Sequence, residues 1–83
     1  MGQPPIEQVF RAVAVAEAEG PAPALALVDE LNLPDYQYWH STRAELLRRL
    51  GRRDEARAAY RRALDLARTA PERRYLQRRI TET

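Results

Sequence analysis

Apolar residues recur every three or four positions along most of the chain, which is the spacing of helices with one buried face. The clearest stretch is Ala44–Leu66, where one helix is followed by a glycine and then by a return helix. Gly51 stands just past the end of the first helix, where a left-handed backbone costs glycine nothing. In the return helix Ala56, Tyr60 and Ala63 share one face. The alanines allow a close helix approach, and the tyrosine ring fills the space between them.

Upstream of this pair, the same spacing predicts two shorter helices that are separated by Gly20-Pro21. The second of them covers about residues 22–31. The residues that we expect to face the core are Ile6, Val9, Phe10 and Val13 in the first helix and Ala24, Leu27, Val28 and Leu31 in the second. Because Asn32-Leu33-Pro34-Asp35 combines proline with capping residues, we expect a break there before a helix over about residues 35–50.

A further helix is predicted near the C-terminal end. Thr69 and Glu72 have the spacing of a capping box, with Pro71 inside the first turn. The residues expected to face inward are Tyr75, Leu76 and Ile80, and those expected to face outward are Arg73, Arg74, Arg78 and Arg79. No segment has the strict alternation of a strand, so the sequence predicts an all-α fold.

The predicted organisation is a single domain over residues 1–83. It has a partly flexible start at residues 1–10, a first, degenerate hairpin at 11–31, a second hairpin at 35–68 and a capping helix at 70–82. Gly20 and Gly51 lie thirty-one residues apart, so both hairpins repeat one pattern. Since two repeats are fewer than a free-standing array needs, we expect the chain to be part of something longer.

The helix–turn–helix pattern resembles the tetratricopeptide repeat (TPR), which implies a TPR-like α-α superhelix with a concave face. The residues that carry the resemblance are Ala44, Leu47, Gly51, Asp54, Glu55, Ala56, Tyr60, Ala63 and Leu64. The chain departs from the pattern at His40, where tryptophan is typical, and at Arg43-Ala44, where Leu-Gly is typical. Arg68 also stands where the repeat usually has its closing proline.

Two longer stretches, Arg11–Leu31 and Tyr38–Ile80, resemble the C-terminal extension of one group of bacterial extracytoplasmic-function (ECF) sigma factors. The similarity lies in RAVAVAEAEGP, in the aromatic–His–x–x–Arg-Ala run before LLRRLGR and in the ending ERRYLQRRI. In that group a TPR-like helical domain follows a sigma core that contacts DNA and polymerase. The resemblance implies a domain that modulates transcription initiation through protein contacts. Its partner would be the sigma core of the same chain, RNA polymerase or a regulator.

The TPR register places five residues of the third helix on the inner, concave face. These candidate protein-binding residues are Tyr38, Ser41, Glu45, Arg48 and Arg49. Arginine can pair carboxylates through two parallel hydrogen bonds, and tyrosine contributes a large contact area at little entropic cost. TPR domains that clamp C-terminal carboxylates carry Lys and Asn on their first helix, where this chain has Phe10 and Ala14. We therefore expect that clamp to be absent.

The sequence offers no constellation for catalysis or for metal binding. It has no Cys and a single His, so the three or four ligands of a zinc site cannot be assembled from these residue types. Ser41 and His40 are not a dyad, because neighbouring helical residues point about 100° apart. We expect His40 to be a hydrogen-bonded packing residue. We also expect no enzyme activity, catalytic residue, cofactor, metal or small-molecule ligand.

Charge is divided unevenly between the two halves of the chain. Residues 1–42 contain one Arg and six acidic residues, whereas residues 43–83 contain thirteen Arg and six acidic residues. Paired arginines can follow a phosphate backbone. Here acidic residues at helical spacing interrupt them, so we expect solvated helix faces rather than direct nucleic-acid binding.

Three absences favour a cytoplasmic protein that does not enter a membrane. The chain has no cysteine, no long apolar run and no basic stretch before an apolar N-terminal core. Two alternatives to the sigma-factor domain stay open at this point. One is an independent TPR adaptor that binds a peptide in its groove, and the other is a basic helical domain that binds nucleic acid.

Overall fold

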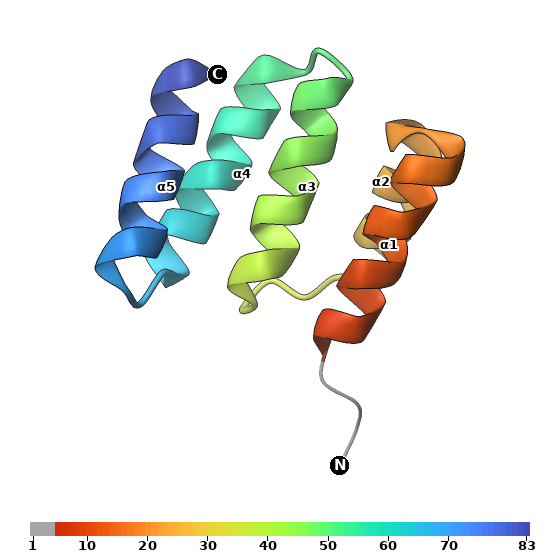
Figure 1. The fold of residues 1–83 in the computed structure, drawn as a ribbon, viewed down its shortest axis with the longest axis horizontal. Helices are drawn as coiled ribbons and strands as arrows, with labels where there is room; N and C mark the ends of the chain where they lie inside the picture. Colours follow the sequence, from red (N-terminus) through yellow and green to blue (C-terminus); the bar gives the residue numbers. More distant parts are fainter. Residues whose placement is uncertain (1–4) are drawn as a thin grey trace.

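Five α-helices make up the fold in the computed structural model, which describes residues 5–83 (Figure 1). They are α1 (Pro5–Glu19), α2 (Pro21–Leu31), α3 (Gln37–Arg49), α4 (Arg53–Leu66) and α5 (Ala70–Glu82). α1 with α2 and α3 with α4 form two antiparallel hairpins, and α5 packs against α4. Residues 5–83 contain no strand, and the all-α, TPR-like fold predicted from the sequence is confirmed.

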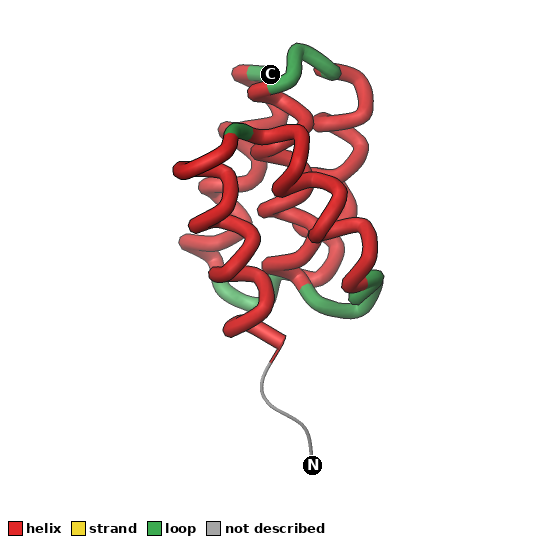
Figure 2. The backbone as a smooth tube through the Cα atoms, turned by 90° about the vertical axis from the view of Figure 1, so that its right-hand side faces the viewer, coloured by secondary structure: helices red, strands yellow, loops and turns green. Residues whose placement is uncertain are grey.

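The two hairpins are joined through α2 and α3, while α1 meets α3 over a smaller area. At the α2–α3 contact the Trp39 indole donates a hydrogen bond to the carbonyl of Val28 at 2.7 Å. On the same contact the Arg43 guanidinium pairs with Asp29 at 2.8 Å. α1, α3 and α5 run in the same direction, and the loops gather at the two ends of the helices (Figures 1 and 2). Side chains of these three helices line one pocket, so the three helices share one face of the fold.

The turn between α3 and α4 depends on the backbone conformation of Gly51. Its φ is 79°, in the left-handed region, as its position past the helix end predicts. The Gly51 N–H donates to the Arg48 carbonyl at 3.0 Å, and the Arg52 N–H donates to the Leu47 carbonyl at 2.9 Å. This pair of bonds is a Schellman motif, which satisfies carbonyls that the last turn of α3 would otherwise leave unpaired.

The start of α5 is fixed by a capping box, which confirms the sequence prediction. The Glu72 N–H donates to the Thr69 hydroxyl at 3.2 Å, and the Glu72 carboxylate accepts from the Thr69 N–H at 3.3 Å. Pro71 lies in the first turn, where its missing N–H costs nothing. The box fixes the first turn of α5, and the helix then packs against α4.

The core is built on the α3–α4 hairpin. Ala56, Tyr60 and Ala63 of α4 are buried, as their shared helical face predicts. His40 is also buried, and its Nε2 lies 2.7 Å from the carbonyl oxygen of Pro34, so it is the hydrogen-bonded packing residue that we expected. Trp39 is buried, while Tyr38 is exposed, because the two neighbours on α3 point in different directions.

The first hairpin differs from the sequence prediction in two ways, both of which concern which apolar residues are buried. α1 includes residues 5–10 of the segment expected to be a partly flexible start, and residues 1–4 of that segment lie outside the described residues. Phe10 and Val13 are exposed, although their helical spacing predicts that both face the core. The buried side of α1 carries Val9, Ala12 and Ala16 instead. Only α2 and part of α3 cover α1, so the buried face is narrower than the apolar stripe. In α2, Leu25 rather than Leu27 is buried.

Two predictions about α5 are wrong. Tyr75, expected to face the core, is exposed, whereas Leu76 is buried. Arg79, expected to face outward, turns inward and pairs with Glu45 at 2.6 Å. Adjacent helical residues point about 100° apart, so burial of Leu76 against α4 leaves Tyr75 on the side of α3 and α1.

Candidate functional site

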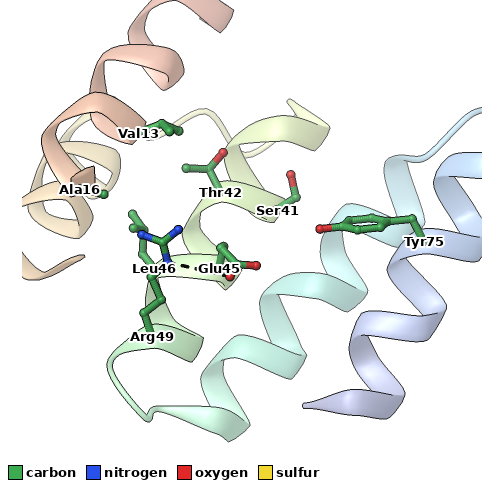
Figure 3. Close-up of a pocket in the computed structure, with 8 residues that line it drawn as sticks. All are labelled: Val13, Ala16, Ser41, Thr42, Glu45, Leu46, Arg49 and Tyr75. Carbon is green, nitrogen blue, oxygen red and sulfur yellow. Dashed lines mark ion pairs between the residues drawn. The ribbon is translucent and has the colours of Figure 1, made fainter. Parts of the chain in front are cut away.

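A pocket of about 210 Å³ opens where α1, α3 and α5 face one another (Figure 3). α1 and α5 contribute apolar and aromatic side chains, while α3 contributes polar, charged and apolar ones. The lining residues are Val13 and Ala16 of α1, Ser41, Thr42, Glu45, Leu46 and Arg49 of α3, and Tyr75 of α5. We call this pocket and its rim the groove.

The structure brings three of the five candidate residues together in this pocket, namely Ser41, Glu45 and Arg49. Tyr38 lies in an adjoining pocket of about 300 Å³, which Ser41 and Tyr75 also line. Arg48 lines neither pocket, because its guanidinium bonds to the Glu45 carboxylate. Four of the five predicted positions therefore lie along the groove.

Sequence reasoning missed three apolar residues of this face. Tyr75 and Val13 line the pocket, and Phe10 lies one turn before Val13 on the same side of α1. The pattern assigned all three to the core, yet their side chains are 45%, 41% and 62% exposed, in that order. A partial signal was present for Tyr75, because it is adjacent to Leu76 and neighbouring residues on a helix point in different directions.

Glu45 is held from three directions by side chains of this chain. Its Oε1 accepts a hydrogen bond from the Tyr60 hydroxyl at 2.8 Å and another from Arg79 at 2.6 Å. Its Oε2 accepts from the Nε of Arg48 at 3.1 Å. Since these donors come from α4, α5 and α3 respectively, the carboxylate ties three helices together.

The same contacts fix the ionisation of Glu45. Burial alone would raise the pKa of its carboxyl, because a charge is costly away from water. Hydrogen bonds from Arg48, Tyr60 and Arg79 outweigh burial and lower the pKa from 4.5 to about 2. Glu45 is therefore ionised at neutral pH with both oxygens already accepting hydrogen bonds, and it acts as a structural carboxylate within the groove.

Arg49 is held much less firmly. Its Nη1 lies 3.7 Å from a Glu17 carboxylate oxygen on α1, and its Nε lies 4.0 Å from Oε2 of Glu45. Both distances exceed those of a normal N–H···O hydrogen bond. Figure 3 shows the side chain reaching from α3 into the space beside α1. Arg49 is thus a cation inside the pocket with donors left for another group.

Tyr38 marks the opposite end of the groove, near the start of α5. Its hydroxyl donates to Glu72 at 3.2 Å, and its ring meets the ring of Tyr36 edge-on at 5.8 Å. The hydrogen bond to Glu72 and the charge of that carboxylate raise the pKa of the Tyr38 hydroxyl. Despite these contacts 43% of the side chain is exposed, so it offers an aromatic surface to a partner.

The described residues lack the features of two classes of site. Residues 5–83 contain no group of three or more His, Cys, Asp or Glu side chains that could hold a metal ion. Within the same residues, no helix combines the length and the apolar character needed to cross a membrane.

Comparison with known proteins identifies the repeat. An uncharacterized protein of Rhizobium meliloti (strain 1021) is 45% identical over 78 residues, which is 92% of this chain and 18% of that protein. The chain therefore spans less than a fifth of that relative's length. No solved structure matches significantly. The family model of the tetratricopeptide repeat matches residues 37–70, which hold α3 and α4. Residues 37–70 are thus a tetratricopeptide repeat, a protein-interaction repeat, within a TPR-like all-α fold.

Proposed function

We propose that this chain is the protein-interaction and regulatory C-terminal domain of an ECF sigma factor. In this proposal residues 1–83 form one domain that acts in the cytoplasm, without catalytic activity, and modulates transcription initiation through protein contacts. The observation that carries the interaction role is the exposure of four large apolar side chains, Phe10, Val13, Tyr38 and Tyr75, on the helices that form one face. This exposure supports a docking role, because large apolar side chains gathered on one face mark interaction sites.

The attachment to a sigma core rests on the sequence resemblance described above. The Rhizobium meliloti relative supports this attachment. The segment that matches this chain makes up less than a fifth of that relative, so there it is one part of a longer protein. A sigma core elsewhere in the same chain is then the first partner to test, with RNA polymerase or a regulator next. An independent TPR adaptor would use the same groove on a peptide from another protein.

One experiment tests the groove and the regulatory role together. In the longer sigma factor that carries this domain, Tyr38→Ala combined with Tyr75→Ala should lower promoter-dependent transcription in vitro by about tenfold or more. The two rings supply the largest exposed contact area on α3 and α5, and anchors of this kind contribute about 2 kcal/mol each. Transcription by purified polymerase is the measurement, and circular dichroism verifies that the helices are retained.

Leu27→Ala is the matched control, since Leu27 is also an exposed apolar residue but lies on α2, outside the groove. It should leave transcription unchanged. If the tyrosine variant transcribed normally while this 83-residue chain still bound a peptide through the groove, the adaptor would replace the sigma-factor domain as the better proposal.

Direct nucleic-acid binding is the second candidate function, and one observation favours it. Within residues 5–83, no ion pair involves Arg61, Arg62, Arg74 or Arg78, which are exposed on α4 and α5. Arginines without an ion-pair partner can neutralise phosphates.

We nevertheless expect the chain to bind duplex DNA more weakly than about 1 μM at physiological salt, because acidic residues interrupt the arginines along both helices. Fluorescence anisotropy over a range of salt concentrations is the measurement. Tighter binding that weakens steeply with salt, and that charge reversal at Arg74 and Arg78 abolishes, would establish the nucleic-acid function instead. Arg79 is left out of that variant because it belongs to the core network of Glu45.

A further inference from the structure

The two charged side chains in the groove differ in their capacity to bind a group from a partner. Of the described residues that line the pocket, Glu45 and Arg49 are the two that carry a charge (Figure 3). Both oxygens of Glu45 already accept hydrogen bonds from Arg48, Tyr60 and Arg79. An incoming cation would have to displace one of these donors, so the one carboxylate that lines the pocket is not available to a basic partner.

Arg49 has the opposite property. Its distances of 3.7 Å to Glu17 and 4.0 Å to Glu45 leave its planar set of N–H donors without a close acceptor in residues 5–83. Glu17 lies on the rim of the groove with 70% of its side chain exposed, so another carboxylate can replace it at little cost. A guanidinium in this state fits a carboxylate through two parallel hydrogen bonds.

The surface next to Arg49 is apolar. Leu46 and Val13 line the same pocket, and Tyr75 closes it from α5 (Figure 3). A partner side chain of the size of leucine or phenylalanine would be removed from water there, which favours binding in proportion to the apolar area covered. The carboxylate and the apolar side chain must lie close together in the partner, because both subsites belong to one pocket.

We propose that the groove selects a partner segment in which an acidic side chain, bound by Arg49, stands next to a large apolar side chain that fills the space between Val13 and Tyr75. This specificity rests on the proposed protein-binding function and names the chemistry of the segment. It also explains why Glu45 faces the groove without serving as a ligand-binding group, since Arg48 and Arg79 occupy its oxygens and Arg49 is left as the available charge.

Selection from a random library tests the composition of the segment and does not require the natural partner. Phage-displayed random peptides of about twelve residues, roughly the length of one strand or helix, are selected on the immobilised 83-residue chain. We expect the selected peptides to be enriched in Asp or Glu beside Leu, Ile, Phe or Trp. A parallel selection on the Arg49→Gln variant should keep the apolar preference and lose the acidic one.

Affinities of one selected peptide then locate the contact. Replacing its acidic residue by the amide should weaken binding to the wild-type chain by about five- to tenfold and leave binding to Arg49→Gln unchanged. Arg62→Gln is the matched control, because Arg62 is exposed on α4 and lines a different pocket, and it should bind the peptide as the wild type does. Arg49→Lys keeps the charge but loses the paired donors, so it should bind with intermediate affinity. Thermal denaturation verifies that each variant is folded.

The outcomes separate this inference from the proposed function. Selected peptides that depend on Tyr75 but show no acidic preference, or an acidic preference that survives in Arg49→Gln, would overturn the specificity and leave the binding groove intact. Peptides that are insensitive to Tyr75→Ala, or a failure to select any peptide, would overturn the groove as a binding site and the specificity with it.

Discussion

Replacing Tyr60 by alanine is expected to unfold a large fraction of the chain. Its side chain is 1% exposed and is the largest fully buried one in the described core. Removing a buried aromatic ring costs about 3–5 kcal/mol, whereas a domain of this size has a total stability of about 4–12 kcal/mol. Urea denaturation followed by far-ultraviolet circular dichroism is the measurement.

Tyr60→Phe is the control that separates ring packing from the hydroxyl. It keeps the ring but removes the hydrogen bond to Glu45, so we expect a loss of about 1–2 kcal/mol. If both variants lost the same stability, the hydroxyl contact and not the packing of the α4 face would dominate at this position.

The second large effect is expected at Glu45. Glu45→Gln keeps the shape of the side chain but leaves Arg48 and Arg79 without their anion. The pKa of about 2 corresponds to a stabilisation of about 2 kcal/mol at neutral pH, after allowance for the 26% of the side chain that water still reaches. Chemical denaturation at neutral pH measures this loss.

The pH dependence follows from the direction of the pKa shift. The folded-state pKa of Glu45 lies below its unfolded value, so its stabilisation is complete above about pH 4.5 and is lost as the pH falls towards 2. The difference in stability between the wild type and Glu45→Gln should therefore shrink as the pH falls through this window. A difference that stayed constant down to pH 2 would contradict the assignment of Glu45 as the ionised centre of the network.

The arrangement of this network has a consequence for the groove. Glu45 joins α3 to α4 and α5, while the loose pair of Arg49 with Glu17 joins α3 to α1. The two contacts flank one pocket. On its α5 side, short hydrogen bonds to Glu45 hold the helices together, whereas on its α1 side the ion pair of Arg49 with Glu17 is longer and weaker. A ligand carboxylate on Arg49 would compete with the weaker pair and leave the stronger one intact.

The local sequence signals predicted the helical elements well because each depends on a few neighbouring residues. Gly51 ends α3 in the left-handed conformation, and Thr69 with Glu72 begins α5, as their types and spacing require. The face of Ala56, Tyr60 and Ala63 is buried, since only this face of α4 has a continuous apolar pattern. The register of the TPR-like repeat likewise brought Ser41, Glu45 and Arg49 to one side of α3.

What the sequence determined by itself was therefore the set of helices, their turns and the TPR-like fold, because helix periodicity and capping are local properties. The tertiary structure alone decided which apolar residues are covered. Phe10 and Tyr75 match a core pattern but lie on the groove, because no further helix of the described chain covers that side of α1 and α5. It also decided that Arg79 turns inward, since the anion that attracts it, Glu45, is thirty-four residues away in the sequence. Such a pairing depends on the packing of α5 against α4, which brings the Arg79 side chain within reach of α3, and no spacing along the chain can reveal it.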